Sequence, residues 1–192
     1  MESAERLSNA NDAVKNHMLA SMATGLIPIP IVDFVALTGI QLNMLHSLGK
    51  QYDVPFSNNV GKSILSSLLG GLIPVNLGKW AAGSLAKLIP IGGTAAGMVS
   101  TAIFGGASTY AVGKVFIQHF ESGGTFLTFD PNKVREHFAA EFAKGKEEAT
   151  AAYQEQQAEK GKEETTAVYQ EQQAEKGKEE ATAAYQEPQA MP

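Results

Sequence analysis

Apolar positions recur every three or four residues along the first quarter of the chain and predict two helices. In residues 3–24 the apolar side chains are Leu7, Ala10, Val14, Met18 and Met22, a spacing that places them on one helical face. Gly25 ends this pattern, and Pro28 and Pro30 fix the entry to a second helix that should run to about Gly49. The stripe of this second helix comprises Phe34, Leu37, Thr38, Leu42, Leu45 and Leu48.

The middle of the chain is apolar and nearly uncharged. Residues 63–78 carry no charged side chain, and a second uncharged run covers residues 88–113. With 26 residues this second run is long enough to cross a bilayer. However, 16 of the 26 are Gly, Ala, Ser or Thr, which favour lipid much less than leucine does. The run therefore predicts either a membrane-associated helix or the tightly packed central helix of a bundle.

Small residues recur at four-residue spacing within this run. Gly93 and Gly97 form one such pair, and Ala102 and Gly106 form another. This spacing creates a face on which two helices approach closely. In a membrane such a face favours self-association, and in a soluble bundle it favours internal helix packing.

Three residues between the two uncharged runs, and one after them, are predicted interface anchors. Trp80 lies between Lys79 and Lys87, and Lys114 follows the second run. An indole flanked by lysines suits the headgroup level of a membrane, because its ring is apolar and its N–H is polar.

Prolines and turn residues predict sharp helix entries and helical hairpins. The triplet Leu-Ile-Pro occurs at residues 26–28, 72–74 and 88–90, each time before a helical pattern. Residues 123–129 predict a turn and a short extended linker, after which Asp130 should cap a helix that has Pro131 in its first turn. The apolar stripe of that helix, which should dock on the body, is Val134, Phe138 and Phe142.

The end of the chain consists of three charged repeats of 16 residues, which begin at Lys144, Lys160 and Lys176. Their Ala, Glu, Gln and Lys favour helix, and the glycine at the start of each copy should interrupt it. A 16-residue period forms no continuous apolar seam, so a coiled coil is not expected. We expect a solvated spacer that is partly helical or disordered.

Charge supports a division into residues 1–143 and 144–192. The first part has nine basic and nine acidic residues, and the second has six lysines and eleven glutamates, so the net charge of −5 lies in the tail. A neutral body with an acidic tail has no basic surface for phosphates, which argues against nucleic acid as a partner. The chain contains no cysteine, and its polar, acidic first residues do not resemble a signal peptide.

No arrangement of reactive residues predicts an enzyme or a cofactor. The last three residues of the phosphate-binding loop motif are matched by Gly61, Lys62 and Ser63, but Phe56 occupies the position at which that motif requires glycine. The four histidines are far apart in sequence, so a metal site is not expected. Neither a nucleophile with a neighbouring base nor a pair of carboxylates has sequence support.

Two polar residues stand out within the apolar second helix. Asp33 comes three positions after Pro30, where a carboxylate accepts hydrogen bonds from free backbone N–H groups of the first turn. This capping role is favoured over contact with a partner or an ion. Gln41, two turns later, is expected to be a hydrogen-bonded amide in the core.

The segment 26–42, in which two prolines precede Asp33 and Gln41, resembles a family of helical domains found in YcjF-like inner-membrane proteins and beside bacterial Era/Ras-like GTPases. The resemblance continues through the glycine-rich segments 91–97 and 110–114 and covers about residues 5–142. It implies a helical, membrane-associated domain without a known active site, at the cytoplasmic side of a bacterial inner membrane, and a GTPase as a candidate partner. This chain itself lacks a GTPase domain.

These patterns predict an all-α fold: a compact bundle of amphipathic and glycine-rich helices with a charged repeat tail. The leading hypothesis is a non-enzymatic, membrane-associated scaffold that self-associates through its small-residue helices, with the tail as spacer or docking strip. One alternative is a soluble adaptor that binds a GTPase or another protein. A further alternative is a membrane-inserting pore-former. The expected partners are therefore a second copy of the chain and membrane lipid.

Overall fold

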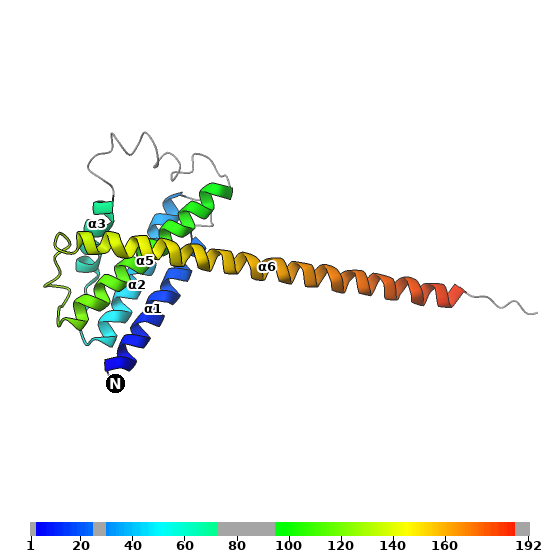
Figure 1. Ribbon diagram of the computed structural model, residues 1–192, viewed down its shortest axis with the longest axis horizontal. Helices are drawn as coiled ribbons and strands as arrows, with labels where there is room; N and C mark the ends of the chain where they lie inside the picture. The colour runs from blue at the N-terminus through cyan, green and yellow to red at the C-terminus, as the bar shows by residue number, and fades with distance from the viewer. Residues whose placement is uncertain (1–2, 25–29, 73–94, 187–192) are drawn as a thin grey trace, which may run out of the picture. The chain divides into compact units, whose positions relative to one another are not determined.

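The computed structural model describes residues 3–24, 30–72 and 95–186, with side chains for residues 3–24, 35–70, 99, 101–160 and 162. These residues form helices and turns without a strand, which confirms the predicted all-α fold (Figure 1). The helices are α1 (Ser3–Thr24), α2 (Pro30–Gln51), α3 (Asn58–Leu72), α5 (Ala95–Glu121) and α6 (Arg135–Gln186). The chain divides into two compact units, Met1–Ala152 and Tyr153–Pro192. We call the first unit the body.

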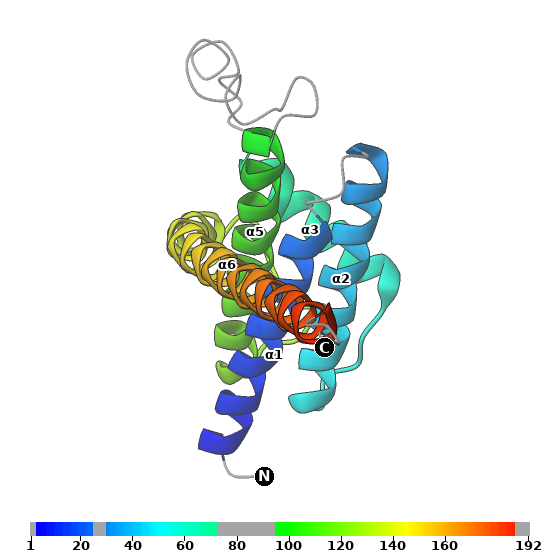
Figure 2. The same ribbon diagram turned by 90° about the vertical axis from the view of Figure 1, so that its right-hand side faces the viewer.

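In the body, α5 is the central helix and packs most extensively against α1, while α2 contacts α1, α5 and α3 (Figure 2). Helices α1 and α3 run in one direction, and α2 and α5 run in the opposite direction. As a result α1 and α3 end, and α2 and α5 begin, at the same end of the body, which lies at the top of Figures 1 and 2. We call this the apical end, and the opposite end, where α1 and α3 begin, the basal end.

The apolar stripes of α1 and α2 form much of the core, as their spacing predicts. Val14, Met18 and Met22 of α1 are buried, whereas Leu7 remains partly exposed. The buried side chains of α2 are Leu37, Gln41, Met44, Leu45 and Leu48. The side chain of Phe34, which belongs to the predicted stripe, lies outside the described residues.

An aromatic cluster fills the core near the basal end and fixes the loop between α5 and α6. The Phe116 and Phe129 rings stack with centroids 4.4 Å apart, and Phe120 meets Phe126 edge-on at 5.1 Å. Phe126 and Phe129 are both buried. Of the turn and short extended linker expected at residues 123–129, the turn is present at Gly123, whereas the extended linker is wrong. The segment makes turns instead, because turns let both rings point into the core.

The last helix begins later than its sequence predicts. The Asp130 side chain accepts a hydrogen bond from the Asn132 N–H at 3.0 Å, and thus caps a turn rather than the helix, which begins at Arg135. The predicted docking stripe is confirmed, since Phe138 is buried and Val134 and Phe142 pack against the core. The expectation that the first repeat glycine interrupts the helix is wrong, because α6 continues through Gly145.

Candidate functional site

The close contact between α1 and α5 depends on glycines of α5. A Cβ atom at Gly105 would lie 3.0 Å from the Ser21 carbonyl oxygen. A Cβ atom at Gly113 would lie 2.7 Å from Val14 Cγ1 and closer still to Val14 Cγ2. Two backbones approach this closely only where one side chain is missing. These glycines therefore set the distance between the two principal helices of the body.

A cluster of neutral polar side chains is buried at this same contact. Ser21 of α1 and Thr109 of α5 share a hydrogen bond with 2.8 Å between their hydroxyl oxygens. Gln41 Nε2 of α2 donates to Ser108 Oγ and to Thr109 Oγ1, at 3.2 Å each. Ser108 in turn donates to the Gly105 carbonyl at 3.0 Å. The four side chains thus join α1, α2 and α5 through hydrogen bonds inside the apolar core.

Gln41 is the least satisfied member of this polar cluster. Its side chain is fully buried, yet Gln41 Oε1 has no hydrogen-bond partner. The predicted core amide is therefore satisfied at its nitrogen and not at its oxygen. A buried polar atom without a partner costs about 1–3 kcal/mol, so Gln41 reduces the stability of the packed helices while it fixes their mutual position.

The start of α6 crosses α5 at a second contact between small residues. A Cβ atom at Gly145 would lie 2.8 Å from the Ala107 carbonyl oxygen, and one at Gly106 would lie 3.1 Å from Ala149 Cβ. Tyr110 lies beside this crossing. Burial, followed by the nearby carboxylates of α6, raises the pKa of the Tyr110 hydroxyl. The first residues of the repeat region thus pack on α5 and belong to the body.

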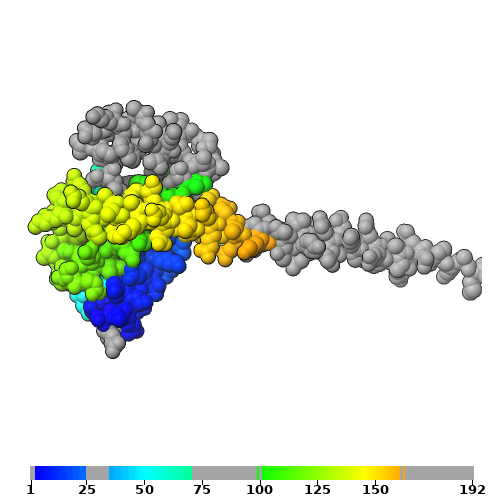
Figure 3. Space-filling view, viewed as in Figure 1, coloured from blue at the N-terminus to red at the C-terminus, as the bar shows by residue number. Residues whose placement is uncertain are grey.

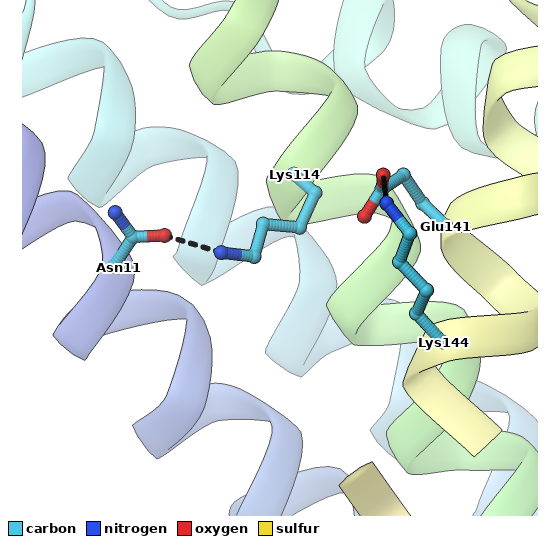
Figure 4. A network of polar contacts seen from close by, with 4 residues as sticks. All are labelled: Asn11, Lys114, Glu141 and Lys144. Carbon is cyan, nitrogen blue, oxygen red and sulfur yellow. Dashed lines mark hydrogen bonds and ion pairs between the residues drawn. The ribbon is translucent and has the colours of Figure 1, made fainter. Parts of the chain in front are cut away.

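Lys114 and Lys144 make polar contacts near these crossings (Figure 4). The Lys114 ammonium donates to Asn11 Oδ1 at 2.5 Å and also lies over the Tyr110 ring. Lys144 pairs with Glu141 at 2.7 Å, and this hydrogen bond raises the pKa of the exposed Lys144. Lys114, predicted to be an interface anchor, is thus directed toward α1 of its own body.

The other predicted site residues divide between described and undescribed parts of the chain. Ala102 is buried, and Gly106 faces Met22 of α1 as well as α6, so this pair serves helix packing within one chain. Asp33 lies in the first turn of α2, as predicted, but its side chain is outside the described residues. So are the contacts of Gly97. The remaining candidates, wholly outside the described residues, are Lys79, Trp80, Lys87 and Gly93.

A polar group at the basal end ties α1 to α5 and to the end of α2. Arg6 lies 3.8 Å from a Glu121 carboxylate oxygen, and its guanidinium is 4.9 Å from the centre of the Tyr52 ring. The Tyr52 hydroxyl is buried without a hydrogen-bond partner of standard geometry. Burial, together with the neighbouring Glu121, raises the pKa of Tyr52 to about 12. These contacts hold the start of α1 against the ends of α2 and α5.

Residues that resemble catalytic or ligand-binding motifs have structural positions. Gly61, Lys62 and Ser63 lie within α3, where Gly61 packs against Phe56, so they form no phosphate-binding loop. His119 bonds to the Thr125 carbonyl at 2.9 Å, and His17 contacts Asn43 at 3.1 Å. Within the described ranges, no three His, Asp or Glu side chains gather as metal ligands would.

The sequence motifs missed most of these contacts. Gly113 and Gly145 lie at the close helix contacts, but neither belongs to a recognised small-residue pair. Ser21, Ser108 and Thr109 carry no local signal, because they meet only after three helices have packed.

No helix in the described part of the chain is both long and apolar enough to cross a bilayer.

Comparison with known proteins places this architecture in a family. Residues 3–147 match a family described as a domain of unknown function, DUF697. The chain belongs to this family. The DUF697 match covers all of α1, α2, α3 and α5 and the first part of α6, whereas Ala149, which also packs on α5, lies just beyond it. It also includes Gly145, which the predicted boundary between residues 143 and 144 assigns to the tail; that boundary remains a prediction.

A named relative of this DUF697 protein is Magnetosome membrane protein 22 of Magnetospirillum gryphiswaldense. The two are 39% identical over 137 residues, which cover 71% of this chain and 70% of the relative. No solved structure matches the chain. The sequence resemblance predicted a family of GTPase-associated helical domains, and the comparison supports membership of DUF697. The specific resemblance to YcjF-like proteins remains a prediction.

Proposed function

We propose that this DUF697 protein is a membrane-associated helical scaffold without enzymatic activity, located at the cytoplasmic face of a bacterial membrane. The observation that carries the proposal is its 39% identity to a magnetosome membrane protein over most of both chains. The composition of the body supports it, because residues 63–113 contain only two charged side chains, Lys79 and Lys87.

Self-association remains part of this proposal in a narrower form. Ala102 and Gly106 are covered by other helices of the same body. A second copy would have to displace those contacts to use this pair. We therefore assign self-association to the Gly93 and Gly97 pair, and we retain the tail beyond Ala152 as spacer or docking strip. The GTPase partner implied by the family resemblance stays a prediction.

Trp80 provides a direct test of membrane association, because it is the only tryptophan of the chain. The full chain is mixed with vesicles of phosphatidylcholine and phosphatidylglycerol and separated by flotation. We expect the chain to float, and we expect Trp80 emission to shift to shorter wavelength as its indole enters the headgroup region. A chain that stays at the bottom of the gradient with unchanged emission would refute the proposal and support the soluble adaptor.

Charge reversal supplies a matched control for this experiment. Each lysine near an anionic membrane surface contributes about 1 kcal/mol to binding. Lys87→Glu should therefore weaken binding to anionic vesicles by about tenfold or more. Lys133→Glu, a reversal at an exposed position on the loop before α6, should leave binding within about twofold of the parent, because we expect this loop to stay in water. Release of dye from the vesicles would favour the pore-former instead.

A further inference from the structure

We infer that a second copy of the chain docks on the outward side of α2, where the exposed Val35 of each copy fills the open position at Gly39 of the other. We call the row Val35, Gly39 and Asn43 the α2 face. This inference rests on the self-association that we propose, and it adds a contact surface whose residues the structure describes. It is drawn from a glycine that the body does not need, from an exposed valine beside it, and from the charge of the α2 face.

Gly39 is a glycine that the packing of the body leaves unexplained. The structure describes the surroundings of eight helix glycines, and at six of them a Cβ atom would lie 3.0 Å or less from another residue: Gly49, Gly61, Gly105, Gly106, Gly113 and Gly145. At Gly39 and Gly70 it would meet nothing within 4 Å. Gly70 lies close to the end of α3, where glycine is common, whereas Gly39 lies well inside α2. Glycine inside a helix is less stable than alanine, so the reason for Gly39 lies outside its own body.

Val35 lies one turn before Gly39 on the same side of α2. Its side chain is 68% exposed, the highest value for a large apolar residue on a described helix. Residues four apart form a row along a helix surface, so Val35 is a protrusion and Gly39 a gap in the same row. Asn43 continues the row and is also exposed. The protrusion and the gap are about 6 Å apart along the helix axis, so one partner helix contacts both.

A protrusion beside a gap makes the α2 face complementary to its own copy. When two α2 helices lie antiparallel about a twofold axis between positions 35 and 39, each Val35 lies opposite the Gly39 of the other copy. Such an interface uses the same patch on both subunits, and the missing Cβ atom lets the two backbones come close. Another partner would have to supply a matching gap and protrusion, which a second copy has by symmetry.

The charge of the α2 face also suits a second copy. Residues 35–49 contain neither an acidic side chain nor a lysine or arginine. Two such faces therefore meet without repulsion between like charges, and the centres of protein interfaces are poor in charged residues. The exposed side of α1, by contrast, carries Glu5, Asp12 and Lys15, whose charges would lose water on contact.

The described residues leave the α2 face open to a second copy. Figure 2 shows α2 at the right-hand edge of the body, on the side opposite to the start of α6. Figure 3 shows the start of α6 lying across α5, so this part of the body is covered by its own chain. Docking on α2 therefore leaves the contact between α5 and α6 in place.

Substitution of Gly39 tests the contact, because it should change folding and association in opposite directions. Gly39→Ala should stabilise the fold, yet its new Cβ atom occupies part of the gap for Val35. In sedimentation of the full chain over a concentration series, we expect a dimer that Gly39→Ala weakens by about three- to tenfold and Gly39→Leu by more. Gly70→Ala is the matched control with equally open surroundings, and it should leave dimerisation within about twofold of the parent.

The absence of cysteine permits a direct test of the pairing. A chain with Val35→Cys and a chain with Gly39→Cys, carrying tags of different length, are mixed and oxidised mildly. A disulfide requires Cα atoms about 4.4–6.8 Å apart, so the mixed disulfide should form about threefold faster or more than a disulfide between two copies of either variant. Leu127→Cys, also at an exposed aliphatic residue, replaces Val35→Cys in the control and should show no preference for Gly39→Cys.

The outcomes separate this inference from the proposed function. If the parent chain forms dimers that Gly39→Leu leaves unchanged, or if the mixed disulfide is not preferred, the α2 face is wrong while self-association through another surface stands. If the parent chain stays monomeric at every concentration, self-association and this inference are both wrong. Flotation of the parent chain reports on membrane association independently of these results. Urea unfolding of Gly39→Ala at a midpoint no lower than that of the parent shows that weaker association does not arise from a weaker fold.

Discussion

Substitution of Gly113 by alanine should destabilise the body, whereas the same change at Gly39 should stabilise it. Both glycines lie within helices, so alanine gains about 0.5–1 kcal/mol of backbone propensity at each. At Gly39 a new Cβ would meet no atom within 4 Å. At Gly113 it would lie 2.7 Å from Val14 Cγ1, and overpacking of this kind costs about 1–3 kcal/mol. We therefore expect net changes in unfolding free energy of about −1 to −2 kcal/mol for Gly113→Ala and about +0.5 to +1 kcal/mol for Gly39→Ala.

Urea unfolding of the full chain, followed by circular dichroism at 222 nm, measures both changes. Val14→Ala provides the internal check, because it removes the two methyl groups that the new Cβ would strike. Alone it should cost about 1.5 kcal/mol, at about 0.8 kcal/mol for each buried carbon lost. Combined with Gly113→Ala it should cost clearly less than the sum of the two single changes. Strictly additive costs, or a Gly113→Ala chain as stable as Gly39→Ala, would refute the proposed helix contact.

Three other changes have defined expected outcomes. Asp53 follows α2 with φ of 54°, a conformation that glycine adopts freely. Asp53→Gly should therefore raise the unfolding free energy by about 1 kcal/mol, also because it removes a carboxylate from the helix C-terminus. An unchanged midpoint in urea titrations would contradict this. The raised pKa of Tyr52, about 12 against 10.0 in an unfolded chain, favours the neutral phenol in the folded state, so stability should be complete below pH 10 and fall as pH rises toward 12. Tyr52→Phe should reduce that alkaline loss in thermal melts, and equal slopes for both chains would argue against it. Gln41→Met should change the unfolding free energy by less than about 1 kcal/mol, since it removes an unpaired buried oxygen along with two hydrogen bonds. Thr109→Val should lower it by about 1–3 kcal/mol, because it leaves Ser21 and Gln41 without their shared partner. A larger loss for Gln41→Met than for Thr109→Val in urea unfolding would show that Gln41 is the more important member.

Periodicity was sufficient to predict α1, α2 and the stripe of α6. Each of these helices buries one face, and the residues of a buried helical face are apolar and lie three or four positions apart in the sequence. Val14, Leu45 and Phe138 were all assigned to the core for this reason, and all three are buried. The end of α1 and the start of α2 follow from Gly25 and Pro30, which act on the backbone within one or two residues.

Features that depend on distant residues could not be predicted in this way. The repeat glycine Gly145 has the composition of a helix breaker, but the proximity of Ala107 makes it a packing position. Similarly, Asp130 and Pro131 form a good helix start, yet the nearby Phe126 and Phe129 pull the chain into turns first. In both cases a tertiary contact outweighs a local preference of about 1 kcal/mol.

The buried polar cluster shows the same limit. Gln41 was recognised as a core amide because it interrupts an apolar stripe. Its partners Ser108 and Thr109 lie 67 and 68 residues later in sequence, and serines and threonines in a small-residue helix give no sign of burial. Only the packing of α1, α2 and α5 identifies them.

Because Gly145 and Ala149 pack on α5, the folded body ends inside the first repeat and not between two repeats. The third repeat begins with the same twelve residues as the first, from Lys176 onward, and the glycine of the first repeat, Gly145, is the one that the structure describes in contact with α5. Gain or loss of a later copy therefore leaves every body contact in place. The length of the tail can change in evolution by one 16-residue unit at a time, about 24 Å of helix, so its reach is free to vary in steps while the fold of the body stays constant.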